Sequence, residues 1–205
     1  MTAIEAIKLA GQAIIEEKDF LTDLDQAIGD GDHGINMARG FSSVFTKIDA
    51  LKDDADISMV LKTVGMGLIS SVGGASGPLY GTAFLRASAA CKDKNAIDAV
   101  TAKEMLDAAI KGIQDRGKAV KGEKTMLDAL IPASEAIGTG IDAGKNVVEC
   151  LKDAVEAAQT GVEYTKTIIA TKGRASYLAE RSIGHQDPGA TSSTTMLKAL
   201  YEYVK

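Results

Sequence analysis

Three aspartates and a histidine are gathered in one short stretch of this 205-residue chain, Asp25-Gln-Ala-Ile-Gly-Asp-Gly-Asp-His-Gly-Ile-Asn36. Three like charges in one turn repel one another unless a cation lies among them. The glycines between them let the backbone curl, so that several oxygens can face one point. Such hard oxygen ligands suit Mg²⁺ or Ca²⁺. The stretch therefore predicts a divalent-metal site; the alternative is a solvated acidic turn that caps the next helix.

A second loop of small residues, Gly73–Pro78, precedes another segment with helical spacing. Pro78 suits the first position of a helix. The unpaired N–H groups at a helix N-terminus favour anions such as phosphate. The loop therefore indicates a phosphate contact, and the alternative is a tight turn between helices that simply needs small residues.

Three familiar motifs are excluded by their details. In an EF-hand register, Gly34 and Phe41 occupy positions that need oxygen ligands. The stretch 117–125 resembles a Walker A loop, but Glu123 is inserted before its lysine and no strand precedes it. The stretch 138–143 fits G-x-G-x-x-A, yet it follows a helix. A nucleotide would therefore be bound without either common α/β phosphate loop.

Composition narrows the class of protein. A net charge of −5 with no basic stripe argues against nucleic acid as a partner. No apolar run is long enough to span a membrane, and the N-terminus lacks the pattern of a secretory signal. Cys91 and Cys150 are isolated and form neither a disulfide framework nor a metal pair. We expect a cytoplasmic protein that is not bound to a membrane.

Apolar residues recur at helical spacing in eight segments, whereas no segment shows convincing strand alternation. The segments lie at about 3–18, 37–48, 58–72, 78–85, 104–113, 125–138, 148–169 and 192–204. Mostly short connections predict an all-α fold, a single-domain antiparallel eight-helix bundle or barrel over residues 1–205. Residues 171–191 break the helical pattern, apart from one predicted turn at 176–181.

Alternate connections of an up-and-down bundle lie at the same end. The acidic loop, the Gly73–Pro78 loop, the 117–124 loop and the 171–191 loop are the four odd-numbered connections. Together they contain both histidines, the clustered aspartates and Arg174. We therefore predict a site at one end of the barrel, where Mg²⁺ ions and a di- or triphosphate would offset each other's charge. Arg174 is a candidate phosphate partner, or else a surface cation.

Five motifs in order resemble those of the L subunit of dihydroxyacetone kinase, the ADP-binding subunit of the enzyme that depends on the phosphotransferase system. The motifs are Gly29–Met37, Ser71–Gly81, Lys124–Asp128, Gly173–Tyr177 and Asp187–Ala190. They extend over nearly the whole chain, and we find no clear departure from the pattern.

The resemblance implies an eight-helix barrel that binds ADP through two Mg²⁺ at one end. By similarity, the metal ligands are Asp25, Asp30 and Asp32. The residues implied along the nucleotide are His33, Gly34, Ile35, Asn36, Gly74, Ala75, Ser76, Gly117, Met126, Arg174, Asp187, Pro188 and Gly189. Of these, Ser76 and Arg174 are implied near the phosphates, and Gly117 and Met126 beside the adenine and ribose.

The resemblance also implies partners. In the family, ADP stays bound, a phosphohistidine on an M subunit converts it to ATP, and the ATP phosphorylates dihydroxyacetone held on a K subunit. Two other functions remain open: a stand-alone Mg²⁺-dependent phosphohydrolase and a non-catalytic adenine-nucleotide sensor. The residues also leave open whether the chain forms a homodimer.

Overall fold

The computed structural model describes residues 2–52, 55–94 and 96–205, and none of these residues lies in a strand. The all-α prediction is confirmed. The helices are α1 (Ala3–Glu16), α2 (Lys18–Ile28), α3 (His33–Asp49), α4 (Ile57–Ser71), α5 (Ser76–Ala90), α6 (Ala99–Gly117), α7 (Leu127–Asp142), α8 (Val147–Thr165), the 3₁₀ segment η1 (Arg174–Ser182) and α9 (Pro188–Val204).

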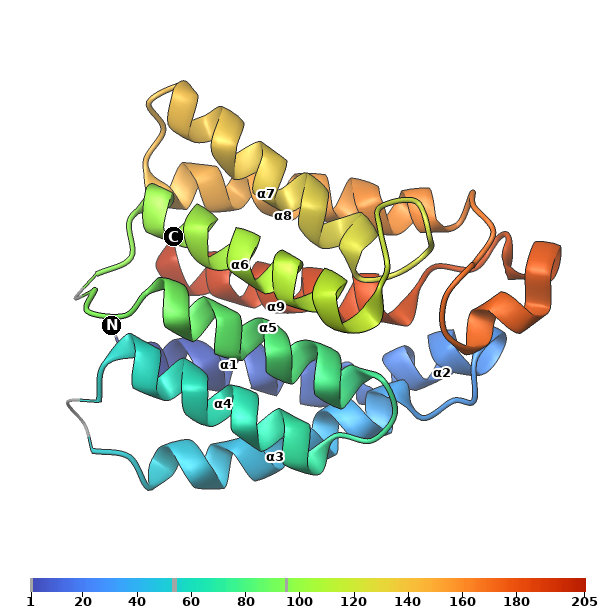
Figure 1. Cartoon of the computed structure of the whole chain (residues 1–205), viewed down its shortest axis with the longest axis horizontal. Coiled ribbons are helices and arrows are strands. Elements are labelled where there is room, and N and C mark those ends of the chain that lie inside the picture. The colour runs from blue at the N-terminus through green and yellow to red at the C-terminus, as the bar shows by residue number, and fades with distance from the viewer. Residues whose placement is uncertain (1, 53–54, 95) are drawn as a thin grey trace.

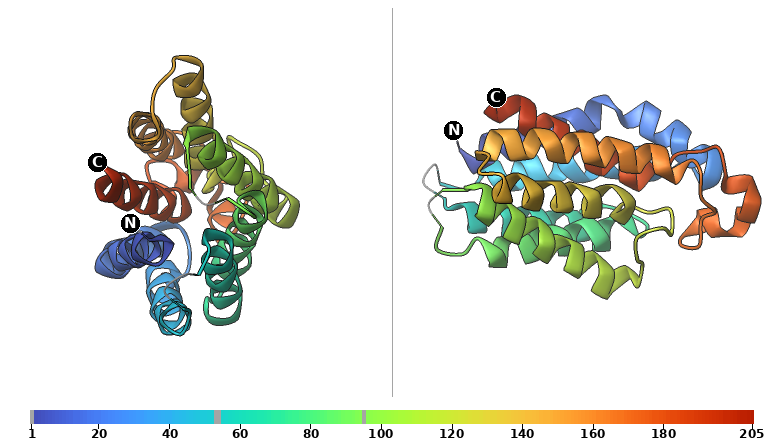
Figure 2. Two further views of the ribbon diagram at one scale, coloured as in Figure 1. Left: turned by 90° about the vertical axis from the view of Figure 1, so that its left-hand side faces the viewer. Right: turned by 90° about the horizontal axis from the view of Figure 1, so that it is seen from above.

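Eight of the helices form a closed ring. Each of α3 to α9 packs against the next in the chain, and α9 returns to pack against α1, which itself contacts α3. The left view of Figure 2 looks along the helices of the ring. In Figure 1 consecutive helices of the ring run in opposite directions along the long axis. The predicted antiparallel eight-helix barrel is therefore confirmed. Among the described residues, no helix is both long and apolar enough to cross a membrane.

Helix α2 is an element that the sequence did not predict. We expected residues 19–24 to be a link into the acidic loop, but Lys18–Ile28 forms a helix after a break at Glu17. The buried residues Leu21 and Ile28 lie seven positions apart, which places both on one face. Helix α2 packs on α3 and α9 outside the ring. Because a Cβ at Gly34 would overlap the carbonyl oxygen of Lys18, this glycine permits the close approach of α2 and α3.

Helix α9 begins four residues earlier than predicted. Asp187 caps it by accepting the backbone N–H of Ala190 at 2.6 Å, and Pro188 takes the first helical position. The Asp-Pro-Gly motif is thus a helix start and not a free turn. Helix α8 ends at Thr165, although apolar spacing had suggested residue 169. The spacing misled because Ile169 is 41% exposed and lies outside the helix.

Two further helix boundaries differ from the prediction. Helix α5 begins at Ser76, so Pro78 lies within its first turn rather than at its start. Gly138 and Gly140 were expected to end a helix, but both lie inside α7. A Cβ at Gly140 would lie 2.7 Å from the Sγ of Cys150, so a small residue is needed where α7 meets α8. Neither glycine ends the helix, and Gly140 is explained by packing against α8.

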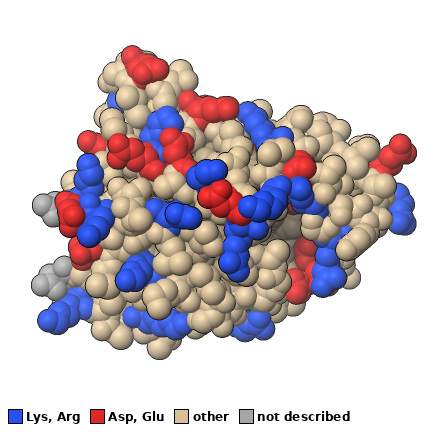
Figure 3. All heavy atoms as spheres, viewed as in Figure 1, with Lys and Arg blue, Asp and Glu red and all other residues tan. Residues whose placement is uncertain are grey.

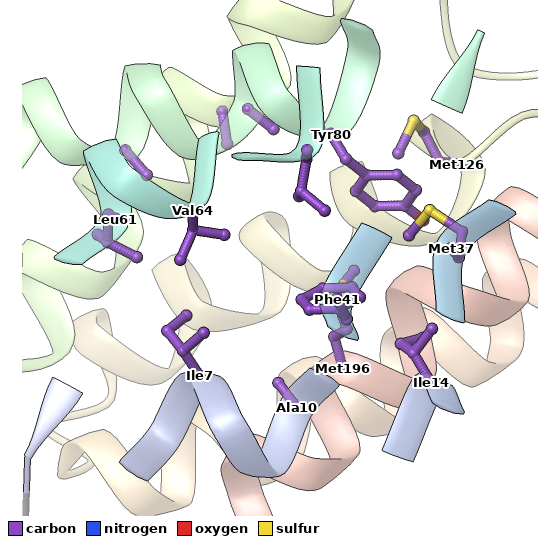
Figure 4. Close-up of a cluster of buried hydrophobic side chains, with 14 of the residues drawn as sticks. Ile7, Ala10, Ile14, Met37, Phe41, Leu61, Val64, Tyr80, Met126 and Met196 are labelled. Atoms are coloured by element: carbon purple, nitrogen blue, oxygen red, sulfur yellow. The ribbon is translucent and has the colours of Figure 1, made fainter. Parts of the chain in front are cut away.

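The core fills the interior of the ring. Its largest cluster draws buried residues from α1 to α7 and α9, and includes Phe41, Met37, Tyr80 and Met126 (Figure 4). A second cluster joins α7, α8 and α9. Tyr80 is the polar member of the first cluster, and its hydroxyl group reaches toward the start of α9. The core thus extends to the end of the barrel where the four predicted loops meet.

Gly161 offers a test of the contact between α7 and α8. A Cβ at this position would overlap the backbone carbonyl of Asp128, which cannot move without separating the helices. We expect Gly161→Ala to lower the free energy of unfolding by about 1–3 kcal/mol. In Gly138→Ala the new methyl meets only the flexible end of Lys103, so that variant should be neutral or about 1 kcal/mol more stable. Urea unfolding measures the stability of both variants. Equal free energies of unfolding would contradict a close contact between α7 and α8 at Gly161.

Candidate functional site

Four connections come together at the end of the barrel opposite both termini (Figure 1). Arg174 of η1 pairs with Asp30 of the acidic loop, and Ser76 of α5 contacts His33 of α3. The third connection, which carries Glu123, bonds to Thr171 in the 166–187 segment. The space-filling view shows a recess toward this end, bordered by both basic and acidic side chains (Figure 3). The predicted convergence of the four loops is confirmed.

Three carboxylates face one point in the acidic loop. One oxygen each from Asp25, Asp30 and Asp32 lies within 4.8 Å of the others. The Oδ2 of Asp25 accepts the backbone N–H groups of Asp32 and His33 at 2.9 and 3.2 Å, which fixes the loop around it. A Cβ at Gly29 would overlap the Oδ1 of Asp25, so only glycine fits there. This donor set of closely spaced carboxylate oxygens fits Mg²⁺.

Helices α3 and α5 both begin at this end of the barrel. The residues before α3 and α5, Asp32 and Ala75, make no side-chain hydrogen bond to the first turn of their helices. Gly74, with φ of +64°, turns the chain into α5 in a conformation that favours glycine. The His33 N–H at the start of α3 already donates to Asp25, so the free N–H groups at the start of α5, with the positive end of its helix dipole, are the more suitable for an anion.

Two arginines lie at the edge of the site. The Nε of Arg174 is 2.7 Å from the Oδ2 of Asp30, and its side chain is largely exposed. Arg39, which the sequence did not single out, donates to the Oδ1 of Asn36 at 2.6 Å. This bond leaves the amide nitrogen of Asn36 as the group that can donate to a ligand. Arg39 lies three residues after Asn36, on the same face of α3, and this spacing could have identified Arg39 from the sequence.

His33 is buried between two serine hydroxyls. Its Nδ1 lies 3.0 Å from the Oγ of Ser76 and its Nε2 lies 2.9 Å from the Oγ of Ser192. Burial lowers the pKa of His33, and the nearby carboxylates of Asp25 and Asp32 only partly offset that effect. The imidazole is therefore neutral near pH 7. It positions groups and does not act as a cation.

Lys124, the lysine of the Walker-like stretch, is only 1% exposed. Its ammonium donates to the backbone carbonyls of Thr165, Ile168 and His185 at 2.6, 3.4 and 2.5 Å. Burial lowers the pKa of Lys124, while the negative charges of Asp187 and Asp128 oppose that shift. The ammonium thus holds the 166–187 segment in place, which agrees with the exclusion of a Walker A role.

Asp187 lies beside this buried lysine. Loss of hydration raises the pKa of Asp187 to about 7, although the N–H of Ala190 and the charge of Lys124 favour the carboxylate. Asp128 binds the backbone N–H groups of Gly122 and Thr125 at 2.5 and 2.8 Å, and its charge also disfavours ionisation of Asp187. The site therefore contains a carboxyl group that changes charge close to neutral pH.

The variant Asp187→Asn tests this carboxyl group, because an asparagine still caps α9 but does not titrate. The folded chain holds the Asp187 proton up to a pKa of about 7, whereas the unfolded chain releases it near 3.8. The free energy of unfolding should therefore fall as pH rises between these values, by at most about 1.4 kcal/mol per pH unit. We expect this decline to be weaker in the variant. Urea unfolding without metal or nucleotide would contradict the prediction if both curves were parallel.

The structure brings most of the predicted residues to one end. Met126, buried before α7, lies against Gly189, and Asn36 lies against Gly73. Ile35 is 48% exposed at the start of α3, while Pro188 is buried in the first turn of α9. Gly117 ends α6 beside Leu79 of α5, and Gly34 faces α2. Tyr80 and Ser192 contact the site but were not predicted, because they meet it from distant parts of the chain.

Comparison with known proteins identifies the family of the chain. The profile of the DAK2 domain matches residues 27–202. The chain therefore belongs to the DAK2 domain family. It is 50% identical over 94% of its length to the ADP-binding subunit DhaL of PEP-dependent dihydroxyacetone kinase 1 from Listeria innocua, covering 90% of that protein. It is 46% identical over 93% of its length to the corresponding DhaL subunit of Escherichia coli, again covering 90% of it.

Solved structures share the fold. The dihydroxyacetone kinase of C. freundii in its native form superposes with a TM-score of 0.75 at 26% identity, over 98% of this chain. The structure of the same kinase in complex with AMP-PNP and Mg²⁺ gives a TM-score of 0.74 at 24% identity, which shows a shared fold only. The chain spans about one third of those kinase chains, at 34% and 33%.

Proposed function

We propose that the chain is the ADP-binding subunit of a PEP-dependent dihydroxyacetone kinase. The observation that carries the proposal is that three carboxylates and Arg174 lie together at the end of the barrel where α3 and α5 begin. The near full-length likeness to DhaL subunits supports the same function. When bound, the nucleotide supplies the group that takes a phosphoryl from a phosphohistidine of an M subunit and gives it to dihydroxyacetone on a K subunit.

The chain's own residues would position this group and neutralise its charge. Asp25, Asp30 and Asp32 would hold two Mg²⁺, since one metal ion would leave part of the repulsion among three carboxylates and a diphosphate uncompensated. The free N–H groups at the start of α5 would donate to phosphate oxygens. Arg174 would exchange Asp30 for phosphate, which its forked guanidinium also fits. Positioning and electrostatic stabilisation are most of what phosphoryl transfer requires.

The rim of the site suits docking of a partner subunit. Ile35 and Val120 are 48% and 56% exposed, and Tyr177 of η1 is 84% exposed. Exposed aromatic and apolar side chains are enriched at protein–protein interfaces relative to the rest of the surface. The rim therefore supports a proposal in which the K and M subunits approach the nucleotide from this end in turn.

Denaturation of the purified protein, followed by nucleotide and metal analysis, tests the proposal. We expect stoichiometric ADP and about two Mg²⁺ per chain. A native sample of the protein should support phosphorylation of dihydroxyacetone only when the K subunit and the phosphohistidine form of the M subunit are added. Failure to retain or rebind ADP with Mg²⁺ present would overturn the proposal. Turnover of phosphate esters by the chain alone would favour a phosphohydrolase, and binding without triose phosphorylation in the full mixture would favour a sensor.

A further inference from the structure

A chain of buried hydrogen bonds crosses the barrel beneath the site. It runs from Ser76 through His33 and Ser192 to the hydroxyl of Tyr80, with distances of 3.0, 2.9 and 2.7 Å. The Tyr80 hydroxyl then contacts the carbonyl oxygen of Gly189 at 2.9 Å. The hydroxyl of Ser193 joins it at 2.8 Å. The chain thus connects α3, α5 and the start of α9.

Counting hydrogens fixes the direction of this chain. Six contacts are present, because the Ser192 hydroxyl also lies 3.2 Å from the carbonyl oxygen of Gly189. They share five hydrogens, one from each of three serines, one from Tyr80 and one from an imidazole with a single N–H. A carbonyl cannot donate, so the contacts among Ser192, Tyr80 and Gly189 need the hydrogens of both Ser192 and Tyr80. Ser192 then has no hydrogen left for His33. The arrangement that serves most contacts therefore has the Nε2–H of His33 donating to Ser192 and Ser76 donating to Nδ1.

We infer that Tyr80 and Ser192 are positioning residues that hold His33 in its Nε2–H form and tie the metal loop to Gly189. Both residues are buried, at 3% and 0% exposure, so water does not replace these bonds. Their partners include His33 and Gly189, which the family resemblance implies along the nucleotide. The predicted effect of these residues on ADP binding therefore rests on the proposed function. The predicted tautomer of His33 does not.

The first test is nitrogen NMR of the histidine rings in the nucleotide-free protein near pH 7.5. The chain has only two histidines, and His185 is exposed, so His185→Gln assigns the spectrum. We expect His33 as a single Nε2–H tautomer in the wild type. In Ser192→Ala the Nε2–H loses its acceptor, and in Tyr80→Phe the Ser192 hydroxyl loses a partner and can donate to Nε2 instead. We therefore expect a mixture of tautomers in both variants. A wild-type Nδ1–H tautomer, or unchanged spectra in both variants, would overturn the inference.

The second test is the affinity for Mg-ADP measured by calorimetry. Each single variant should bind about three- to tenfold more weakly, the effect of one lost hydrogen bond. The double variant should be no weaker than the weaker single variant, because both act through one chain. Thr194→Val is the matched control: Thr194 is buried on the same helix, but its hydroxyl donates to its own helix at Ala190. That control should keep wild-type affinity and tautomer.

The two proposals fail in different ways. A wild-type protein that does not bind Mg-ADP overturns the proposed function, while the tautomer measurement still tests the hydrogen-bond chain. Normal ADP binding with losses in Thr194→Val equal to those in Tyr80→Phe, or with additive losses in the double variant, overturns the positioning role alone. Thermal unfolding of every variant separates these outcomes from a loss of fold.

Discussion

Asp30→Asn is expected to weaken Mg-ADP binding by about 100-fold or more while leaving the fold intact. Asp30 is the most suitable of the three carboxylates for this test. Asp25 also binds two backbone N–H groups, and Asp32 precedes α3, so their loss would disturb the loop itself. Asp30 is exposed and pairs with Arg174. Its replacement removes one metal ligand and one negative charge at nearly constant shape.

The control is Asp23→Asn, which removes the same charge from an exposed position on the preceding helix. Its effect should stay within about threefold, since an exposed charge in water interacts weakly at this range. Calorimetric titration with Mg-ADP at constant ionic strength measures both variants, and thermal unfolding without nucleotide checks the fold. Equal losses in the two variants would show that general charge, and not ligation, governs binding.

Lys124→Met is expected to lower the free energy of unfolding by about 3–5 kcal/mol. Methionine fills a similar volume but leaves three buried carbonyls without the donor they share. It also leaves the charge of Asp128 nearby without its buried counterion. The 166–187 segment, which carries Arg174, should loosen, so that ADP binding weakens beyond the effect on stability.

Lys121→Met serves as the matched control for this lysine. Lys121 is exposed and pairs with Glu135 at 3.0 Å, an ion pair worth less than about 1 kcal/mol. Urea unfolding followed by circular dichroism compares the two variants. Should Lys124→Met fail to fold, Lys124→Arg keeps the charge and should be intermediate in stability. A loss below 1 kcal/mol in Lys124→Met would contradict the structural role of the ammonium.

The sequence predicted the barrel because its eight ring helices carry regular apolar spacing, and the order of connections alone placed four loops at one end. It did not reveal α2, because a run of charged residues before Phe20 hides the start of its short amphipathic pattern. Nor could it reveal contacts such as Tyr80 with Ser192, since 112 positions separate them. The metal loop was predictable because its residues are local, whereas the bonds that hold His33 depend on tertiary packing.

The two termini lie at the end of the barrel away from the site (Figure 1). The ring helices are 14 to 19 residues long, which corresponds to about 20–30 Å between the two ends. A tag, a solid support or an additional domain attached at either terminus would therefore leave the mouth of the barrel clear. The same geometry suits covalent fusion to a partner at either terminus. An engineered tether could thus raise the local concentration of a partner without obstructing its approach.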